Sequence, residues 1–155
     1  MKKISSTKGI GLLEIMLVLA VISLMLVSVI RYFSIVNRTN RVGQAITMVN
    51  AIRAAGERWK ATHGDYKTLT VGTELQDLVN RGLLPDIYGL SNVKNPWGGN
   101  VSANKGTDST QLDIKFLGIP SPDCTNFVKM IKKTGCTPTP TDACTSATTD
   151  VVATC

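Results

Sequence analysis

The stretch KGIGLLEIMLVLAVISLMLVSVI, residues 8–30, decides the fold of this chain. Its residues 15–30 are sixteen positions without a charge, and Arg31 closes the run. Counted from Ile10, the run has 21 residues, with Glu14 as its one charged interruption. An α-helix of that length spans about 31 Å, which is the thickness of a bilayer core. The sequence therefore predicts a membrane-spanning helix.

The residues before this run form a short basic leader. It contains three lysines and ends at Gly9, immediately before the apolar residues. Lysines on the N-terminal side hold that side in the cytoplasm, so residues 32 onward are expected outside. A secretory signal would have a shorter apolar stretch, followed by a small-x-small cleavage site. No such site follows this run cleanly.

Glu14 is an anomaly, because an ionised carboxylate in an apolar span costs several kcal/mol unless it has a partner. A cut between Gly9 and Ile10 would create a new α-amino group and make Glu14 the fifth residue of the shortened chain. The chain's own new amine would lie one helical turn away, which allows some self-pairing. The amine of a neighbouring copy could pair better with Glu14 when helices lie side by side. In a dry helix bundle no water competes with that pair.

The run Lys8-Gly9-Ile10-Gly11-Leu12-Leu13-Glu14, followed by an apolar helix, resembles the class III signal of type IV prepilins. Its Leu-Leu-Glu sequence is most similar to the type IVb set. The resemblance implies that a membrane prepilin peptidase cuts after Gly9 and that the new N-terminus, Ile10, is methylated. It also implies that Glu14 sets the register between subunits.

The same resemblance implies where the chain resides and what it meets. The precursor would lie in the bacterial inner membrane, and the mature chain in an extracellular pilus. Its partners would be further copies of itself in a homopolymeric filament, the prepilin peptidase and methyltransferase, the inner-membrane assembly machinery, and the membrane before assembly. No cofactor is implied.

The helix is expected to continue beyond the membrane, because no proline occurs between residues 10 and 62. Residues 10–31 would form its transmembrane and assembly half, and residues 32–62 an amphipathic half packed on a globular domain. We expect Gly64 to end the helix, and Gly43 and Gly56 to mark soft points in it. The apolar positions recur at helical offsets, and they are Val36, Val42, Ile46, Val49, Ile52 and Ala55.

Residues 63–155 are expected to form a small α+β domain. The predicted fold is a long N-terminal helical spine packed on a small antiparallel sheet, with a disulfide-stapled C-terminal region. Alternation of Leu112, Ile114 and Phe116 with charged residues predicts a half-buried strand. The Asn95–Gly99 turn is similar to the Pro-Trp-Gly turn of pilins and pseudopilins. We predict helices at 73–81 and 124–133, strands at 99–103, 111–117 and 151–154, and a Thr/Pro-rich surface loop at 137–147.

Four cysteines, Cys124, Cys136, Cys144 and Cys155, lie in the last 32 residues. Their even number in a small domain behind an export-type N-terminus predicts two disulfides in an oxidising compartment. No C-x-x-C pair occurs and His63 is the only histidine, which disfavours a zinc site.

The distance that each cysteine can span narrows the possible disulfide pairings. If Cys124 begins a ten-residue helix, Cys136 lies beyond the far end of that helix, about 15 Å away. Three extended residues could barely return that distance, which disfavours a Cys124–Cys136 disulfide. Two pairings remain: Cys124–Cys155 with Cys136–Cys144, or Cys124–Cys144 with Cys136–Cys155. We prefer the first because it pins the C-terminus, and it is similar to the long C-terminal disulfide loop of type IVb pilins.

The sequence offers no arrangement of catalytic residues and no metal-ligand set, so we expect no enzyme. His63 is expected to be a capping or surface residue. Gly98 and Gly99 lack the spacing of a phosphate-binding loop. The formal charge of +6 falls by three if the leader lysines are removed, so nucleic-acid binding is not expected. The only candidates for such binding are Lys129, Lys132 and Lys133. A solvent-exposed helix face would explain their positive charges.

The expected function is therefore that of a pilin, a structural subunit that polymerises through its apolar helix into a type IV pilus. Such a fibre would serve adhesion, motility, aggregation or DNA transfer. The alternatives are a minor pilin or type II secretion pseudopilin, and a monomeric membrane-anchored binding domain.

Overall fold

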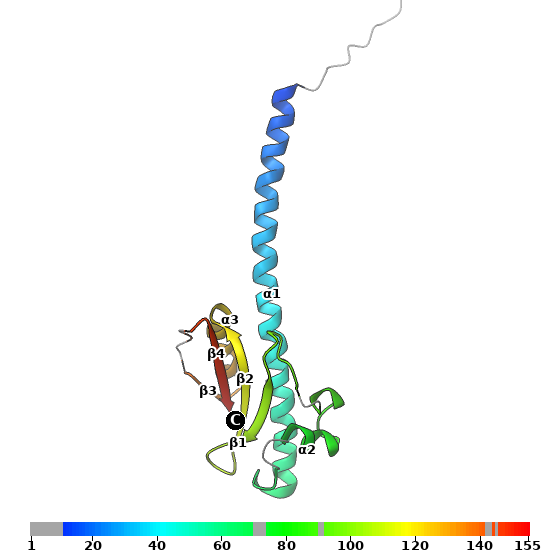
Figure 1. Ribbon diagram of the computed structural model, residues 1–155, viewed down its shortest axis with the longest axis vertical. Coiled ribbons are helices and arrows are strands. Elements are labelled where there is room, and N and C mark those ends of the chain that lie inside the picture. The colour runs from blue at the N-terminus through cyan, green and yellow to red at the C-terminus, as the bar shows by residue number, and fades with distance from the viewer. Residues whose placement is uncertain (1–10, 70–73, 90–91, 142–143, 145) are drawn as a thin grey trace, which may run out of the picture. The chain divides into compact units, whose positions relative to one another are not determined.

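The computed structural model describes residues 11–69, 74–89, 92–141, 144 and 146–155. The chain divides into two compact units, one ending at Asn37 and one comprising Arg38–Cys155. The predicted α+β fold is confirmed (Figure 1). In chain order its elements are α1 (Leu12–His63), α2 (Glu74–Asn80), the 3-10 helix η1 (Asp86–Tyr88), β1 (Val101–Lys105), β2 (Leu112–Pro120), α3 (Ser121–Lys133), β3 (Thr137–Thr139) and β4 (Thr148–Thr154).

The long helix α1 ends where the sequence predicts. Gly64 follows His63 with a φ of +84°, a left-handed conformation that glycine adopts without strain. The predicted start of α1, at Ile10, lies outside the described residues. Of the predicted stripe, Val42, Val49, Ile52 and Ala55 are buried in the second unit, whereas Val36 and Ile46 are only half-buried. Ala45, Gly56 and Trp59 extend the stripe. The buried positions are Val42, Ala45, Val49, Ile52, Ala55, Gly56 and Trp59.

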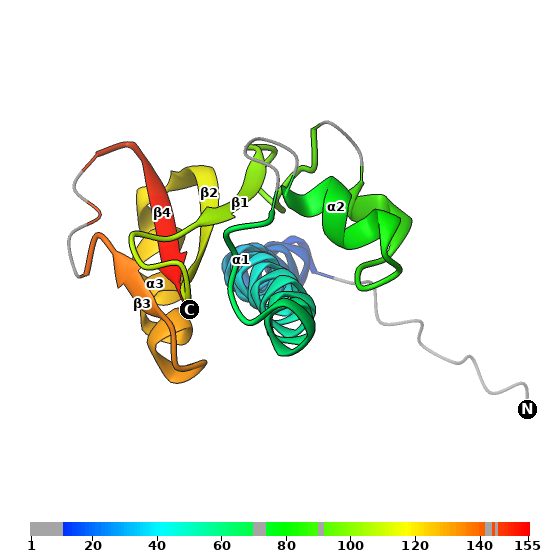
Figure 2. The ribbon, with the colours of Figure 1, turned by 90° about the horizontal axis from the view of Figure 1, so that it is seen from below.

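The sheet has four antiparallel strands in the order β1-β2-β4-β3. β2 is central, with Val101 of β1 opposite Phe116, and Ala153 of β4 opposite Ile114. The predicted alternation in β2 is confirmed, since Leu112, Ile114 and Phe116 are buried. α3 packs across β2, β3 and β4 (Figure 2). These side chains form one core with the buried stripe of α1 from Val42 onward.

The short strand β3 was not predicted, because residues 137–147 contain prolines and were interpreted as a surface loop. The structure pairs Pro138 with Ala153 of β4. Proline cannot donate to a ladder, but it is accepted on an edge strand. Pro138 is buried while Thr137 and Thr139 are exposed, so this edge alternates like the other strands.

Both disulfides are present, but our preferred pairing is wrong. Cys124 is bonded to Cys144, with their Cα atoms 6.0 Å apart. Cys136 is bonded to Cys155, with their Cα atoms 4.5 Å apart. The pairing of β3 with β4 explains this result. Thr137 lies opposite Thr154 in an antiparallel ladder, so the residue before Thr137 and the residue after Thr154, Cys136 and Cys155, lie next to each other. The disulfides still pin the C-terminus, through Cys136 rather than Cys124.

Gly56 has a packing role that its interpretation as a soft point in the helix missed. It is buried, and a Cβ at this position would lie 2.7 Å from Cδ2 of Leu112 and 3.3 Å from the hydroxyl of Tyr66. The missing side chain therefore allows α1 to approach β2 closely. Gly43 differs, because a Cβ there would meet nothing within 4 Å.

We predict opposite effects for alanine at these two glycines. Gly56→Ala should destabilise the fold by about 1–3 kcal/mol, because the methyl group overpacks the helix–sheet contact. Gly43→Ala should stabilise it by up to about 1 kcal/mol, the helix-propensity gain alone. Thermal unfolding of the full chain in detergent measures both. Equal shifts of the two midpoints would show that Gly56 has no packing role.

Candidate functional site: an exposed apolar helix

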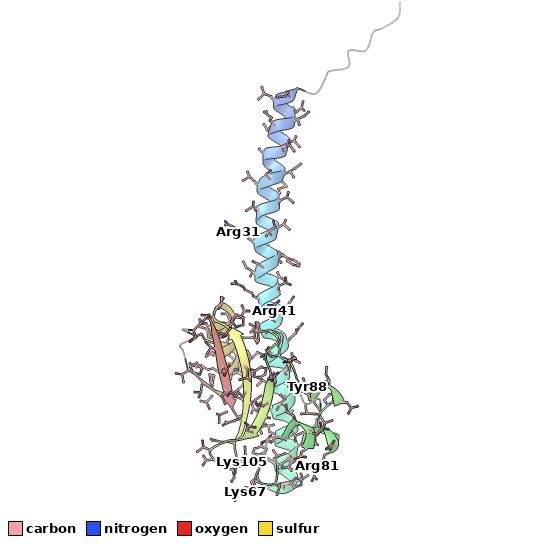
Figure 3. All side chains as sticks on the ribbon, viewed as in Figure 1. Arg31, Arg41, Lys67, Arg81, Tyr88 and Lys105 are labelled. Atoms are coloured by element: carbon pink, nitrogen blue, oxygen red, sulfur yellow. A yellow bond between two sulfur atoms is a disulfide. The ribbon has the colours of Figure 1, made fainter. Side chains whose placement is uncertain are left out.

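The feature that stands out in the first unit is its apolar surface. Every residue from 11 to 35 is exposed, although most are leucine, isoleucine, valine or methionine. Figure 3 shows their side chains projecting from all sides of the helix. Exposed apolar patches on this scale mark membrane or protein contacts. By length and composition this part of α1 can cross a membrane.

The polar side chains within this surface are mostly satisfied by the helix itself. The hydroxyl groups of Ser23, Ser28 and Ser34 donate to backbone carbonyls four, four and three residues back, at 2.8, 3.1 and 2.8 Å. Such bonds allow serine to lie in hydrocarbon or in a dry helix bundle. The helix is therefore suited to a waterless environment.

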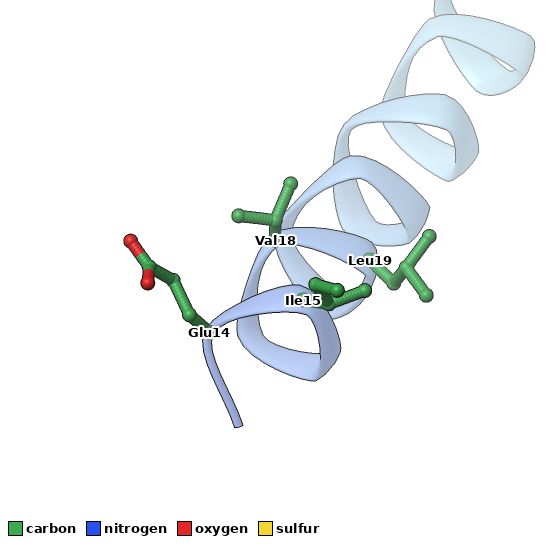
Figure 4. Close-up of a pocket in the computed structure, with 4 residues that line it drawn as sticks. All are labelled: Glu14, Ile15, Val18 and Leu19. Atoms are coloured by element: carbon green, nitrogen blue, oxygen red, sulfur yellow. The ribbon is translucent and has the colours of Figure 1, made fainter. Parts of the chain in front are cut away.

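Glu14 lies in the first turn of α1. With Ile15, Val18 and Leu19 it lines a shallow groove of about 320 Å³ on the helix surface. Figure 4 shows its carboxylate pointing away from the helix while the three apolar side chains form the rest of the groove. Among the described residues, none forms an ion pair with Glu14.

The groove has the geometry of a helix-packing site. Its four residues are two pairs of neighbours one turn apart, so they surround a depression between adjacent ridges of the helix surface. A side chain from a second helix fits such a hole. The predicted cleavage site, Gly9 and Ile10, lies outside the described residues, so the roles assigned to Gly9, Ile10 and Glu14 stay predictions.

A second depression lies in the globular unit. It has a volume of about 380 Å³ and a mainly apolar lining, and burial raises the pKa of its one phenol, Tyr88. Its one cation, Lys94, donates from Nζ to Oδ1 of Asn100 at 2.6 Å. This depression can hold an apolar group. Its lining consists of Met48, Ile87, Tyr88, Asn92, Val93 and Lys94.

Trp97, in the turn that the sequence predicts at Asn95–Gly99, is held by a network that the sequence did not reveal. Its indole Nε1 donates to Oδ2 of buried Asp123 at 2.8 Å, and its ring meets Phe127 edge-on. Nε of Arg38 lies 3.8 Å from Oδ1 of the same carboxylate. Asn95 accepts from the backbone N–H groups of Trp97 and Gly99, which closes the turn. This network connects α1, the turn at Trp97 and α3.

The remaining residues singled out from the sequence are on the surface. His63 is exposed and stacks on Trp59, with ring centroids 4.2 Å apart. Lys129, Lys132 and Lys133 are exposed on α3, as a solvated helix face requires.

No model of a known protein family matches the chain, and no curated protein sequence matches it either. The architecture, a long apolar N-terminal helix followed by a small antiparallel sheet with two disulfides, is consistent with a pilin-like arrangement.

We predict that Asp123 stabilises the domain through Trp97 more than through Arg38. Asp123→Ala should lower the free energy of unfolding by about 1–3 kcal/mol, because it leaves the indole N–H without its charged acceptor. Arg38→Ala should cost less than about 1 kcal/mol, since Arg38 is largely exposed. Urea unfolding of the full chain in detergent separates the two. Equal losses would contradict this assignment.

Proposed function

We propose that this chain is the precursor of a pilin-type fibre subunit. The observation that carries the proposal is the exposed, almost wholly apolar surface of residues 11–35. An isolated helix with this surface has no stable place in water. Before assembly its place is a bilayer, and after assembly it is a bundle of helices from further copies.

The order of membrane insertion and filament assembly follows from how the bilayer and the helix bundle each cover the apolar surface. The apolar run matches the bilayer thickness, so the precursor is held in the bacterial inner membrane with its globular unit outside. Leaving the bilayer exposes apolar surface unless another copy covers it at once. Assembly is therefore coupled to extraction, and the product is an extracellular filament.

Glu14 guides this exchange. The resemblance to type IV prepilins assigns cleavage after Gly9 and methylation of Ile10 to a prepilin peptidase. The α-amino group made by that cut is the cation that Glu14 of a neighbouring copy lacks. Within a dry bundle such a pair has no competition from water, and a misplaced copy leaves a carboxylate unpaired. The pair thereby sets the register of assembly.

The globular unit then forms the outer surface of the fibre. Its two disulfides close loops in a domain too small to rely on its core alone. A fibre of this kind serves adhesion, motility, aggregation or DNA transfer. Its role is mechanical, without catalysis or cofactor.

A minor pilin or pseudopilin would share this architecture. The second candidate of another class is a monomeric membrane-anchored binding domain, and the depression beside Tyr88 is the feature that favours it. The two classes differ in whether copies associate outside the cell.

We expect Glu14→Val to insert into the membrane normally and to yield at least about tenfold less extracellular filament, because the partner amine is left uncompensated. Ser28→Val is the matched control on the same helix: its hydroxyl is satisfied internally, so filament yield should be unchanged. Electron microscopy of sheared surface material, with membrane fractionation, measures both. Filaments at wild-type yield from Glu14→Val would refute the proposal.

A further inference from the structure

The exposed apolar helix carries a second charged side chain, Arg31, which the proposed pair between Glu14 and a new N-terminus does not include. Among residues 11–37, Glu14 and Arg31 are the only acidic or basic side chains. Neither belongs to an ion pair within the part of the chain that the structure describes. They stand 17 residues apart, about 26 Å along the helix.

Arg31 lies within the apolar surface and not at its edge. Beyond it the helix exposes Tyr32, Phe33 and Ile35, with 71, 65 and 61% of each residue accessible. Whatever covers these side chains also covers Arg31. Burial of its guanidinium without an anion is costly. In a bilayer the side chain can extend to the headgroups, but in a bundle of helices it needs a carboxylate.

We infer that Arg31 of one copy pairs with Glu14 of a second copy that is displaced by about 26 Å along the helix axis. This inference rests on the proposed function and adds a specific register to it. Copies that insert into a membrane with one orientation have parallel helices. For parallel helices, a displacement of 17 residues is the one that places these two opposite charges side by side.

Such a contact joins different surfaces of the two copies. Each copy offers Glu14 to one neighbour and Arg31 to another, so the contact is heterologous and does not close. It extends along the helix axis and generates a filament. Glu14 then lies between two cations from different neighbours, a new α-amino group and Arg31, so the carboxylate is shared and one net positive charge remains per copy.

The register can be tested by cross-linking in filaments of the full-length chain. Val18 and Ile35 lie one turn after Glu14 and Arg31, on the same helix faces, and are also 17 residues apart. A chain with Val18→Cys and Ile35→Cys should give a ladder of covalent oligomers after mild oxidation. The native cysteines do not interfere, because all four are in disulfides.

The matched control combines Val18→Cys with Val29→Cys, a separation of 11 residues. It should give no more cross-linking than the two single variants. A ladder no stronger for Val18/Ile35 than for this control would overturn the inferred register.

A charge variant provides the second arm. Arg31→Gln should lower filament yield at least about tenfold, because it leaves the carboxylate with one partner fewer. Arg41→Gln, at an exposed position of the second unit, should change the yield by less than about twofold. Wild-type yield from Arg31→Gln would overturn the pair while leaving the fibre function intact. Absence of filaments from the unaltered chain would overturn both proposals.

Discussion

The structure depends on one constraint, the need to cover an apolar helix surface that the chain itself leaves open. From residue 11 to residue 35 every side chain is exposed, and the serines among them are already satisfied by their own helix. The hydrophobic effect therefore acts between molecules rather than within one. A bilayer and a bundle of copies both satisfy this constraint, and they differ in what they offer to Glu14 and Arg31. In the proposed filament, this difference gives an otherwise non-directional interaction a direction and a register.

The second unit solves the opposite problem, which is to bury enough surface in a small domain. From Arg38 onward α1 supplies one wall of the core, and Gly56 lets it approach the sheet closely enough for Leu112 and Tyr66 to pack against it. Asp123 joins this helix to α3 and to the turn at Trp97. Two disulfides then fix the edge strand β3 and the start of α3. In the proposed assembly, the domain remains folded while the rest of the helix passes from the membrane to the filament.

Local patterns in the sequence predicted most helices and strands. The features that depend on contacts between distant residues could not be predicted from it. The end of α1 at Gly64 and the alternation in β2 depend on neighbouring residues, and both are confirmed. β3 was missed because Pro138 favours a loop locally, whereas its pairing with β4 is set by residues far along the chain. The error in disulfide pairing followed directly from that missed register. The bond between Trp97 and Asp123 spans 26 residues and has no local signal. Glu14 could be singled out because a charge in an apolar run is visible in sequence alone, whereas the partner that we propose for it belongs to another molecule.

The central claim is that the apolar helix begins at a newly made amine and is covered by further copies outside the cell. The most direct measurement is the intact mass of the chain recovered from sheared surface material. The account predicts a chain that starts at Ile10, carries a methyl group there and has all four cysteines oxidised. A chain that keeps Met1 and its lysines, and is recovered only from the membrane, would contradict it.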